Sequence, residues 1–197
     1  RIFSNNMSRY TEDDLTNALI EFYREHSDHD PKIEPEAPYD HYGKKGFADL
    51  YIELEKLGLS DTMNERVDKK EAHLIEVKSE SAVKSVTGAN DIIRQFNRMR
   101  QNFYKDDNRS TPAPIVETQV VNLVFELTFI PTPFTITHIF DNIEMYVEAI
   151  TSNSVDPQVP KDAKALSVSH DGVEFGGVEV SLTLRDPAEP HPPVTII

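Results

Sequence analysis

A carboxylate and an ammonium group lie two residues apart in the segment Ala72–Glu80, whose sequence is AHLIEVKSE. Because side chains alternate between the two faces of a β-strand, Glu76 and Lys78 point to the same face of a strand formed here. The opposite face consists of residues that suit a core, namely His73, Ile75 and Val77. Such a pair is either a solvated surface feature or part of a chemical site. The choice depends on which other side chains reach the same face.

A second acidic residue occupies a strand that precedes this one in the chain. Over residues 47–54 one face is apolar (Ala48, Leu50, Ile52 and Leu54) and the other carries Phe47, Asp49, Tyr51 and Glu53. We expect the two strands to pair, which places Asp49 on the same sheet face as Glu76. Residues 55–71 would form a long polar connection between them, and a connection of this length is uncommon in a compact domain.

An amphipathic helix is predicted over Tyr10–His26. Thr11 is its expected N-cap, and Asp14 completes a capping box three residues later. The apolar stripe consists of Leu15, Leu19, Phe22 and Tyr23. Glu12 lies in line with this stripe, and two interpretations stay open. Its carboxylate either faces inward or complements the helix dipole from the first turn.

A second helix is predicted over Thr87–Tyr104, with an apolar stripe at Ile92, Phe96, Met99 and Phe103. Gln95 lies at the boundary between this stripe and a basic stripe made of Arg94, Arg98, Gln101 and Lys105. Residues 80–109 carry six basic and four acidic side chains, in a chain whose net charge is −14. The basic stripe is therefore either a solvated face or a surface for an anionic partner. The predicted turn Asp40–Gly46 adds two candidates for phosphate contacts, Lys44 and Lys45.

The remaining elements follow from the same patterns. They are an edge strand at Lys32–Tyr39, a polar approach at Ser81–Thr87, a central strand at Thr118–Phe129, a helix at Thr135–Ile150, a loop at Thr151–Lys164 and a β-hairpin over Ala165–Leu184 with its turn near His170–Gly172. The Pro-rich tail from Asp186 is expected to be loosely held. We expect a core domain at residues 7–150 and a C-terminal extension at residues 151–197 that packs on the same domain.

Composition narrows the classes of function. The 197 residues are 38% hydrophobic, which is enough for a core, and the chain has no Cys. The lack of thiols excludes disulfides and thiolate metal sites and fits a reducing compartment, so we expect a cytoplasmic protein. No apolar run reaches the length of a membrane span. The negative charge argues against a generic nucleic-acid-binding protein, although an acidic exterior is also typical of proteins from a high-salt cytoplasm.

The order helix, three strands, helix, strand, with these residues in these places, resembles the PD-(D/E)XK nuclease superfamily. Its members include restriction endonucleases, Holliday-junction resolvases and RecB-like exonucleases. The family's acidic residue falls on Asp49, in Gly-Phe-Ala-Asp-Leu, and its Glu-x-Lys falls on Glu76 and Lys78, in Leu-Ile-Glu-Val-Lys. The helical Gln falls on Gln95, and the first-helix Glu falls on Glu12 in the pattern Glu-x-x-Leu-x-x-x-Leu. The resemblance covers residues 11 to about 130.

The sequence departs from the family pattern at three points. Ala48 replaces the Pro of the motif's name. The connection between Asp49 and Glu76 is longer than in compact members, which implies an inserted loop. Met99 occupies a position where the RecB-like pattern often has Tyr, so the resolvase-like and RecB-like branches both stay open.

The resemblance implies a restriction-endonuclease-like α/β fold, with a mixed β-sheet core in the order α-β-β-β-α-β flanked by helices and, in this chain, a C-terminal β-hairpin extension. It also implies a Mg²⁺-dependent deoxyribonuclease, either endo- or exonuclease, for which Mn²⁺ is the expected substitute. Asp49, Glu76 and the backbone carbonyl of Val77 would hold the metal. Lys78 would orient or deprotonate the attacking water.

The same resemblance assigns supporting roles to further residues. Glu12 would hold a second metal or its waters, and Gln95 would steady the site from its helix. Residues of the basic stripe (Arg94, Arg98 and Lys105) would contact the backbone phosphates of DNA, which gives affinity without sequence readout. A homodimer stays open, because resolvases act as two-fold dimers.

Two other functions are compatible with the sequence. One is a catalytically silent nuclease-fold module that binds nucleic acid or protein, and the other is a structural or assembly protein. The presence of Asp49, Glu76 and Lys78 together favours the enzyme. A histidine metal site among residues 26–30 matches no zinc spacing pattern.

Overall fold

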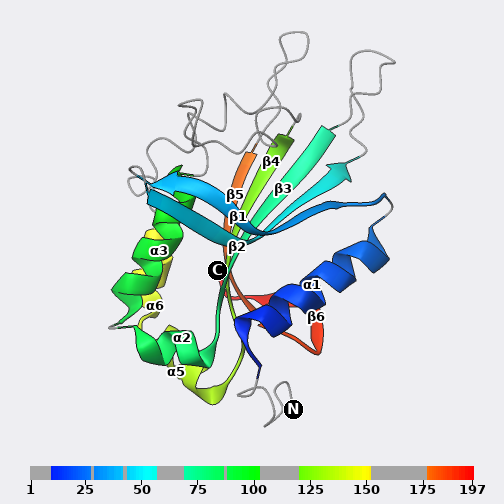
Figure 1. Cartoon of the computed structure of the whole chain (residues 1–197). Coiled ribbons are helices and arrows are strands. Elements are labelled where there is room, and N and C mark those ends of the chain that lie inside the picture. Colours follow the sequence, from blue (N-terminus) through cyan, green and yellow to red (C-terminus); the bar gives the residue numbers. More distant parts are fainter. Residues whose placement is uncertain are drawn as a thin grey trace.

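The computed structural model describes residues 10–27, 29–41, 44–56, 69–86, 88–102, 120–151 and 177–197. These residues form a six-stranded sheet with helices on both faces (Figure 1). The strands are β1 (Lys32–His41), β2 (Lys44–Lys56), β3 (Lys69–Lys78), β4 (Val120–Phe129), β5 (Gly177–Asp186) and β6 (Glu189–Thr195). The helices are α1 (Glu12–His26), α2 (Glu80–Ser85), α3 (Ala89–Asn102), α5 (Pro133–Asp141) and α6 (Ile143–Thr151).

The sheet is mixed and follows chain order from β1 to β6. Strands β1, β2 and β3 form an antiparallel meander, β3, β4 and β5 run parallel, and β6 returns antiparallel to β5. Parallel neighbours need crossover connections, and helices supply them: α2 and α3 follow β3, and α5 and α6 follow β4. The order α-β-β-β-α-β predicted from the sequence is present, with α2 as an addition.

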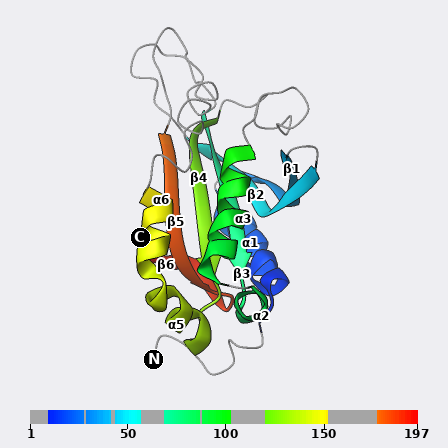
Figure 2. The same cartoon turned by 90° about the vertical axis from the view of Figure 1, so that its left-hand side faces the viewer.

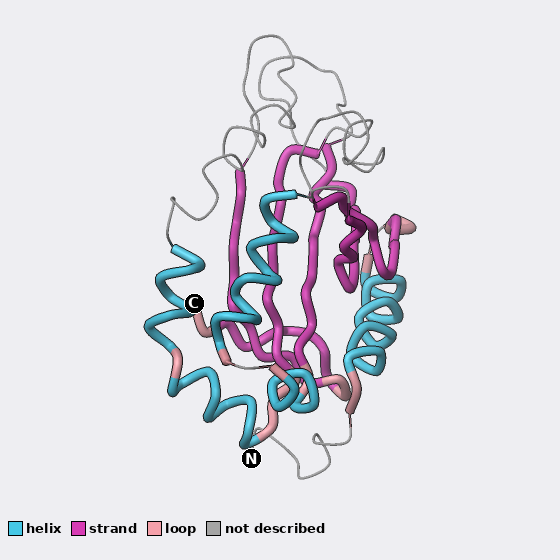
Figure 3. Tube along the Cα trace, turned by 60° about the vertical axis from the view of Figure 1, so that its left-hand side comes forward, coloured by secondary structure: helices cyan, strands magenta, loops and turns pink. Residues whose placement is uncertain are grey.

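Two hydrophobic cores cover the two faces of the sheet. Helix α1 lies against one face, and α3, α5 and α6 lie against the other (Figures 2 and 3). The α1 core consists of Leu15, Leu19, Tyr23, Leu50, Ile52, Ile75, Val77 and Ile130. The opposite core includes Leu74, Ile92, Phe96, Met99, Phe125, Leu127 and Phe129. Strand β3 contributes to both cores by alternation, so the predicted assignment of its faces is confirmed.

Helix α1 begins where the sequence predicts. The Asp14 N–H donates to Thr11 Oγ1 at 3.2 Å, and the Thr11 N–H donates to Asp14 Oδ2 at 2.7 Å. This capping box satisfies amides that a helix N-terminus otherwise leaves unpaired. The cap makes Glu12 the first helical residue, which places it in the first turn as predicted.

Two segments of the crossover connections differ from the prediction. Residues 80–85 form α2, although the sequence predicted only a polar approach to the next helix at 81–87. Ser79 caps this helix, because its Oγ accepts the Ala82 N–H at 3.2 Å. The single helix predicted at 135–150 is two helices, since Asn142 ends α5 with φ −120° and ψ 20°. A capping box at Thr132 starts α5 two residues earlier than predicted.

The predicted turn Asp40–Gly46 is largely strand. Strands β1 and β2 extend into it, and His41 pairs with Lys44. Strand pairing thus reaches His41 and Lys44, on either side of residues 42 and 43, which lie outside the described residues. The backbone of Lys44 and Lys45 belongs to β2, and their side chains lie outside the described part of the chain.

The C-terminal segment also differs from its prediction. The first arm and turn of the predicted hairpin at 165–184 lie outside the described residues, and its second arm is β5, which pairs with β4 and β6. The Pro-rich tail, predicted to be loosely held, forms β6. Arg185 fastens this strand, because its guanidinium donates to the Pro190 carbonyl at 2.7 Å. Proline is tolerated here because β6 is an edge strand. The predicted domain boundary at residue 150 stays a prediction.

Candidate active site

The candidate site lies where β2 and β3 separate. Their described ladder ends at the pair Leu50–Ile75, and Asp49 and Glu76 are the next residue on each strand. Asp49 Oδ2 accepts a hydrogen bond from the backbone N–H of Val77 at 2.7 Å. The Asp49 side chain thus bridges the two strands and lies beside Glu76, as the alternation of the two strands predicts.

Lys78 links β3 to helix α3. Its ammonium donates to Glu76 Oε1 at 3.0 Å and to Gln95 Oε1 at 2.8 Å. The exposed fractions of Lys78 and Glu76 are only 7% and 9%, so the ion pair is largely removed from water. An ammonium has three donors, and within the described residues Lys78 uses two of them. One donor is therefore available to a further acceptor.

Glu12 reaches the end of β3 from the first turn of α1. Its Oε1 accepts hydrogen bonds from the backbone N–H and the hydroxyl of Ser79, at 3.2 and 3.3 Å. Ser79 directly follows Lys78 and caps α2, so this contact fixes the point at which β3 passes into a helix. Of the two interpretations of Glu12, the geometry matches the inward-facing one.

Negative charge is in excess at this site. Burial, followed by the neighbouring Glu76 carboxylate, raises the pKa of Asp49 from 3.8 to about 7. Burial also raises the pKa of Glu76 and outweighs the opposing effect of Lys78. For Lys78 itself, burial lowers the pKa. The carboxylates of Glu76, Glu12 and Asp49 together reverse this effect, so the Lys78 pKa is raised and its amine is charged. Three carboxylates thus act on one ammonium, and one of them, Glu76, contacts it directly.

Such a donor set fits a hard divalent cation. Ionised carboxylates in a poorly hydrated place are costly unless a cation accompanies them. Mg²⁺ favours carboxylate and carbonyl oxygens and keeps several waters, so it needs few protein side chains. Within the described residues no three His, Asp or Glu side chains form a metal-binding group. The protein ligands available to such a cation are therefore the carboxylates of Asp49 and Glu76 and the backbone at the point where β2 and β3 separate.

Comparison with known families identifies this arrangement. A family model that describes a PD-(D/E)XK nuclease superfamily domain matches residues 10–182. The chain belongs to the PD-(D/E)XK nuclease superfamily. The mixed sheet and its flanking helices are accordingly a restriction-endonuclease-like fold. The match extends through β4 and into β5, well past residue 130, where the resemblance seen in the sequence ends. Neither the curated proteins nor the solved structures gave a match.

The structure describes two of the basic residues that the sequence predicted to contact DNA, Arg94 and Arg98. Arg94 is exposed on α3 and pairs with Asp91, one turn earlier. Arg98, one turn further along, is half-buried and lies within electrostatic range of Glu76, whose pKa it lowers. Arg98 is therefore the member of the predicted basic stripe that lies next to the carboxylates. Three other predicted contacts lie outside the described residues, namely Lys105 and the side chains of Lys44 and Lys45.

The sequence did not single out two residues that the nuclease fold brings to this site. One is Ser79, whose signal was its position directly after Lys78 as a potential helix cap. The other is Tyr39 on β1, which lies within electrostatic range of Glu76 and Asp49. In the sequence, the residues around Tyr39 show only the weak alternation of a Pro-containing edge strand. The approach of Tyr39 to the site depends on the twist and packing of that strand, which no local pattern specifies.

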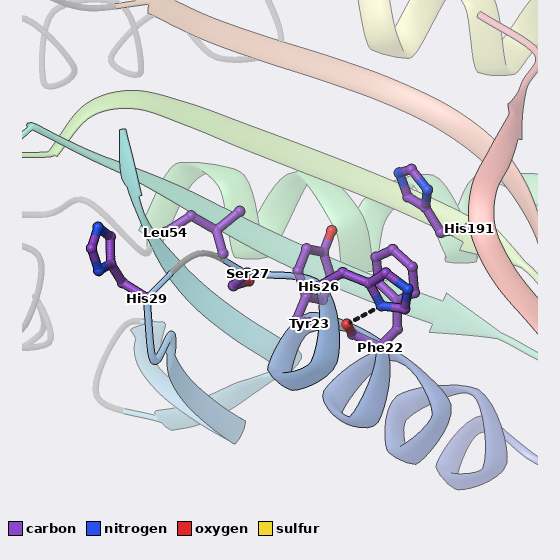
Figure 4. Close-up of a pocket in the computed structure, with 7 residues that line it drawn as sticks. All are labelled: Phe22, Tyr23, His26, Ser27, His29, Leu54 and His191. Atoms are coloured by element: carbon purple, nitrogen blue, oxygen red, sulfur yellow. Dashed lines mark hydrogen bonds between the residues drawn. The ribbon is translucent and has the colours of Figure 1, made fainter. Parts of the chain in front are cut away.

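A separate pocket of about 650 Å³ lies on the α1 face of the sheet (Figure 4). Its lining consists of Phe22, Tyr23, His26, Ser27, His29, Leu54 and His191. The Phe22 ring stacks with the rings of His26 and His191, at centroid distances of 4.3 and 4.7 Å. None of the nuclease-site residues lines this pocket. The described histidines around it belong to no group of three metal-binding side chains.

Within the described ranges, none of the helices of this domain combines the length and the apolar character needed to cross a bilayer.

Proposed function

We propose that this chain is a Mg²⁺-dependent deoxyribonuclease that hydrolyses phosphodiester bonds at Asp49, Glu76 and Lys78. Membership of the PD-(D/E)XK superfamily supports a nuclease-type function in general. The observation that carries the more specific proposal is the surplus of carboxylates near a single ammonium, at the point where β2 and β3 separate. Glu76 is buried, and Asp49 and Glu12 are half-buried.

Asp49 and Glu76 would hold the metal, together with the Val77 carbonyl. Asp49 uses one carboxylate oxygen for the Val77 N–H, and Glu76 uses one for Lys78, so each has a second oxygen for a cation. When bound, Mg²⁺ neutralises phosphate charge and lowers the pKa of a coordinated water. Mn²⁺ has similar ligand preferences and is the expected substitute.

Lys78 would orient the attacking water or a phosphate oxygen through its remaining donor. Its raised pKa favours this role over that of a general base, because the amine carries its proton at neutral pH. Gln95 holds the ammonium from α3, and this contact limits the positions that the lysine can adopt. Glu12 supports the same strand end through Ser79, and a role for it at a second metal stays a prediction.

DNA is the proposed substrate, although the chain as a whole is acidic. Contacts to backbone phosphates would come from Arg94 and Arg98 on α3, together with Lys105, Lys44 and Lys45. A bound divalent cation reverses the local charge at the carboxylates, so the net charge of −14 does not prevent a phosphate from approaching. A homodimer stays a prediction.

Cleavage assays test the proposal. The purified chain is incubated with circular single-stranded, plasmid, linear duplex and branched DNA, in Mg²⁺, Mn²⁺ or EDTA. We expect metal-dependent cleavage that EDTA abolishes and that Lys78→Ala loses. Lys84→Ala, at an exposed lysine of α2, is the matched control and should cut like the wild type. Cleavage of the circular single strand would identify an endonuclease, and its resistance beside a degraded linear strand would identify an exonuclease.

Two results would overturn the enzyme assignment. One is the absence of cleavage of every substrate in either metal, and the other is a Lys78→Ala variant that cuts as fast as the wild type. The catalytically silent module predicts a distinct pattern. In that case DNA binding would survive Glu76→Ala, be lost in Arg94→Ala/Arg98→Ala, and never lead to cleavage.

A further inference from the structure

Tyr39 lies on the edge strand β1, opposite Gly46 of β2. Two pairs along the hairpin, on the same face, Ala37 lies opposite Ala48, and both alanines are buried. These small residues let the hairpin pack against α3, which contacts both strands (Figure 1). Tyr39 joins the core beneath α3 and is only 7% exposed. An edge-strand tyrosine is thereby carried to the helix that holds Gln95.

Gly46 fixes how the Tyr39 ring lies. A Cβ atom added to Gly46 would come within 2.3 Å of Tyr39 Cε2 and Cζ and within 2.6 Å of its hydroxyl oxygen. The hydroxyl end of the ring therefore lies directly over the Gly46 backbone. Only a residue without a side chain allows this approach, because real Cβ contacts do not occur at such distances. The pair sets the direction of the phenol.

The phenol lies close to the candidate active site. Burial raises the pKa of Tyr39, the carboxylates of Glu76 and Asp49 raise it further, and Arg98 lowers it. The hydroxyl is thus protonated at neutral pH and is a hydrogen-bond donor. No hydrogen bond joins it to another described residue, and its oxygen is not among the described polar atoms that are sealed from solvent without a partner. The hydroxyl is therefore open to an acceptor from outside the chain, beside a site proposed to bind an anion.

We propose that the Tyr39 hydroxyl binds a backbone phosphate oxygen of the DNA substrate and that Gly46 holds the ring in position for this contact. The inference rests on the proposed nuclease function and adds a substrate-binding residue to it. Arg98, on α3, acts electrostatically on both Tyr39 and Glu76, so a phosphate at this place would be near a neutral donor and near a guanidinium. The phenol is neutral and the guanidinium is charged, so the salt dependence of binding distinguishes the two contacts.

Tyr39→Phe is the primary test, because it removes one oxygen and keeps the ring over Gly46. Binding of a fluorescein-labelled oligonucleotide is measured in Ca²⁺, and cleavage kinetics in Mg²⁺. A hydrogen bond to a charged group corresponds to about a tenfold or greater loss, which we expect in Kd and KM more than in kcat. Tyr23→Phe is the matched control, since Tyr23 is equally buried (8% exposed) but lies in the α1 core.

Salt dependence separates this contact from an ionic one. Arg98→Ala should reduce the slope of log Kd against log salt by about one, because an ionic phosphate contact releases a counterion. Tyr39→Phe should weaken binding with no change in that slope, because the phenol is neutral. A merely structural role for Tyr39 would lower the melting temperature and leave the Kd of the folded protein unchanged.

Gly46→Ala provides an independent perturbation, since it keeps the hydroxyl but displaces it. We expect a loss of binding similar to that of Tyr39→Phe, and a double variant no weaker than the single ones, because both remove one interaction. The inference is wrong if Tyr39→Phe binds and cuts within twofold of the wild type, or if the two losses multiply. A wild-type protein that neither binds nor cuts DNA would instead overturn the proposed function.

Discussion

Within the described residues, each face of the sheet buries an acid–base pair, and the two pairs differ in what surrounds them. On the α1 face, Arg185 donates to both oxygens of Glu126, at 2.8 and 2.7 Å, and to the Pro190 carbonyl. On the α3 face, the ammonium of Lys78 meets one oxygen of Glu76. Both pairs are less than a tenth exposed. Burial of a charged pair therefore does not by itself mark a functional site.

The difference lies in how far the charges are balanced. The Glu126–Arg185 pair is bidentate, and a further donor of the guanidinium ties β6 to the sheet, which is what a structural ion pair requires. At the α3-face site, Asp49 and, from the first turn of α1, Glu12 join Glu76, so carboxylates outnumber the single ammonium. The pKa values of Asp49 and Glu76 rise. An ion pair whose carboxylate oxygens both bond to the protein stabilises the fold. A cluster with an excess of carboxylates is instead a candidate site for a cationic ligand.

Breaking the Glu126–Arg185 pair should have the largest effect on stability. Arg185→Ala leaves the Glu126 carboxylate buried without its partner, which corresponds to a loss of about 3–5 kcal/mol in the free energy of unfolding. Urea denaturation measures this loss. The double variant Glu126→Leu/Arg185→Met should recover much of it, because apolar replacements leave no stranded charge. A loss below about 1 kcal/mol for the single variant would contradict the structural assignment.

Removing a carboxylate from the unbalanced cluster should reduce activity strongly and leave the stability of the fold intact. Asp49→Asn should reduce metal-dependent cleavage by more than about a hundredfold, since even residues behind a metal ligand cost up to that much. Its melting temperature without metal at pH 8 should equal or exceed that of the wild type, because the raised pKa shows that the ionised carboxylate is disfavoured in the fold. Asp141→Asn, at an exposed residue, is the control. A strongly destabilised Asp49→Asn protein would make Asp49 a structural residue.

The pH dependence sharpens the same comparison. The Asp49 pKa rises on folding from 3.8 to about 7, so the folded state keeps a proton that the unfolded state has lost. The contribution of Asp49 to stability is therefore fully present below about pH 4 and is lost as the pH rises to about 7. A metal must displace that proton, so its apparent Kd should weaken about tenfold for each pH unit below 7. Calorimetry in buffers of different ionisation enthalpy would detect the released proton, and a pH-independent Kd would exclude this linkage.

Loosening the lysine without changing the cluster's charge should have the smallest effect. Gln95→Ala removes the contact at 2.8 Å that holds the Lys78 ammonium from α3. We expect about a tenfold fall in kcat, the lower end of what supporting residues contribute, with an unchanged melting temperature. Asn90→Ala, at an exposed amide of the same helix, serves as the reference. Equal kcat values for the two variants would show that Gln95 does not position Lys78.

Local patterns predicted the elements of the site well. Alternation placed Glu76 and Lys78 on one face of β3, and a capping box located the start of α1. Local patterns failed where an element is too short to show a period, or where contacts between distant segments decide the secondary structure. Ser79 starts a six-residue helix too short to show a periodic stripe, and Asn142 interrupts a segment whose apolar spacing is continuous. The Pro-rich tail became β6 because Arg185 and the edge of β5 supply its partners.

The sequence by itself determined which face of each element carries the chemistry, because the periods of strands and helices are local properties of the chain. It therefore placed Asp49, Glu76, Lys78 and Gln95 on their elements and indicated the family. The tertiary structure alone decided how these faces meet. Asp49 accepts from Val77, 28 residues away, and Glu12 accepts from Ser79, 67 residues away. Such contacts depend on strand register and helix docking, which arise from packing between distant segments and leave no local pattern in the sequence.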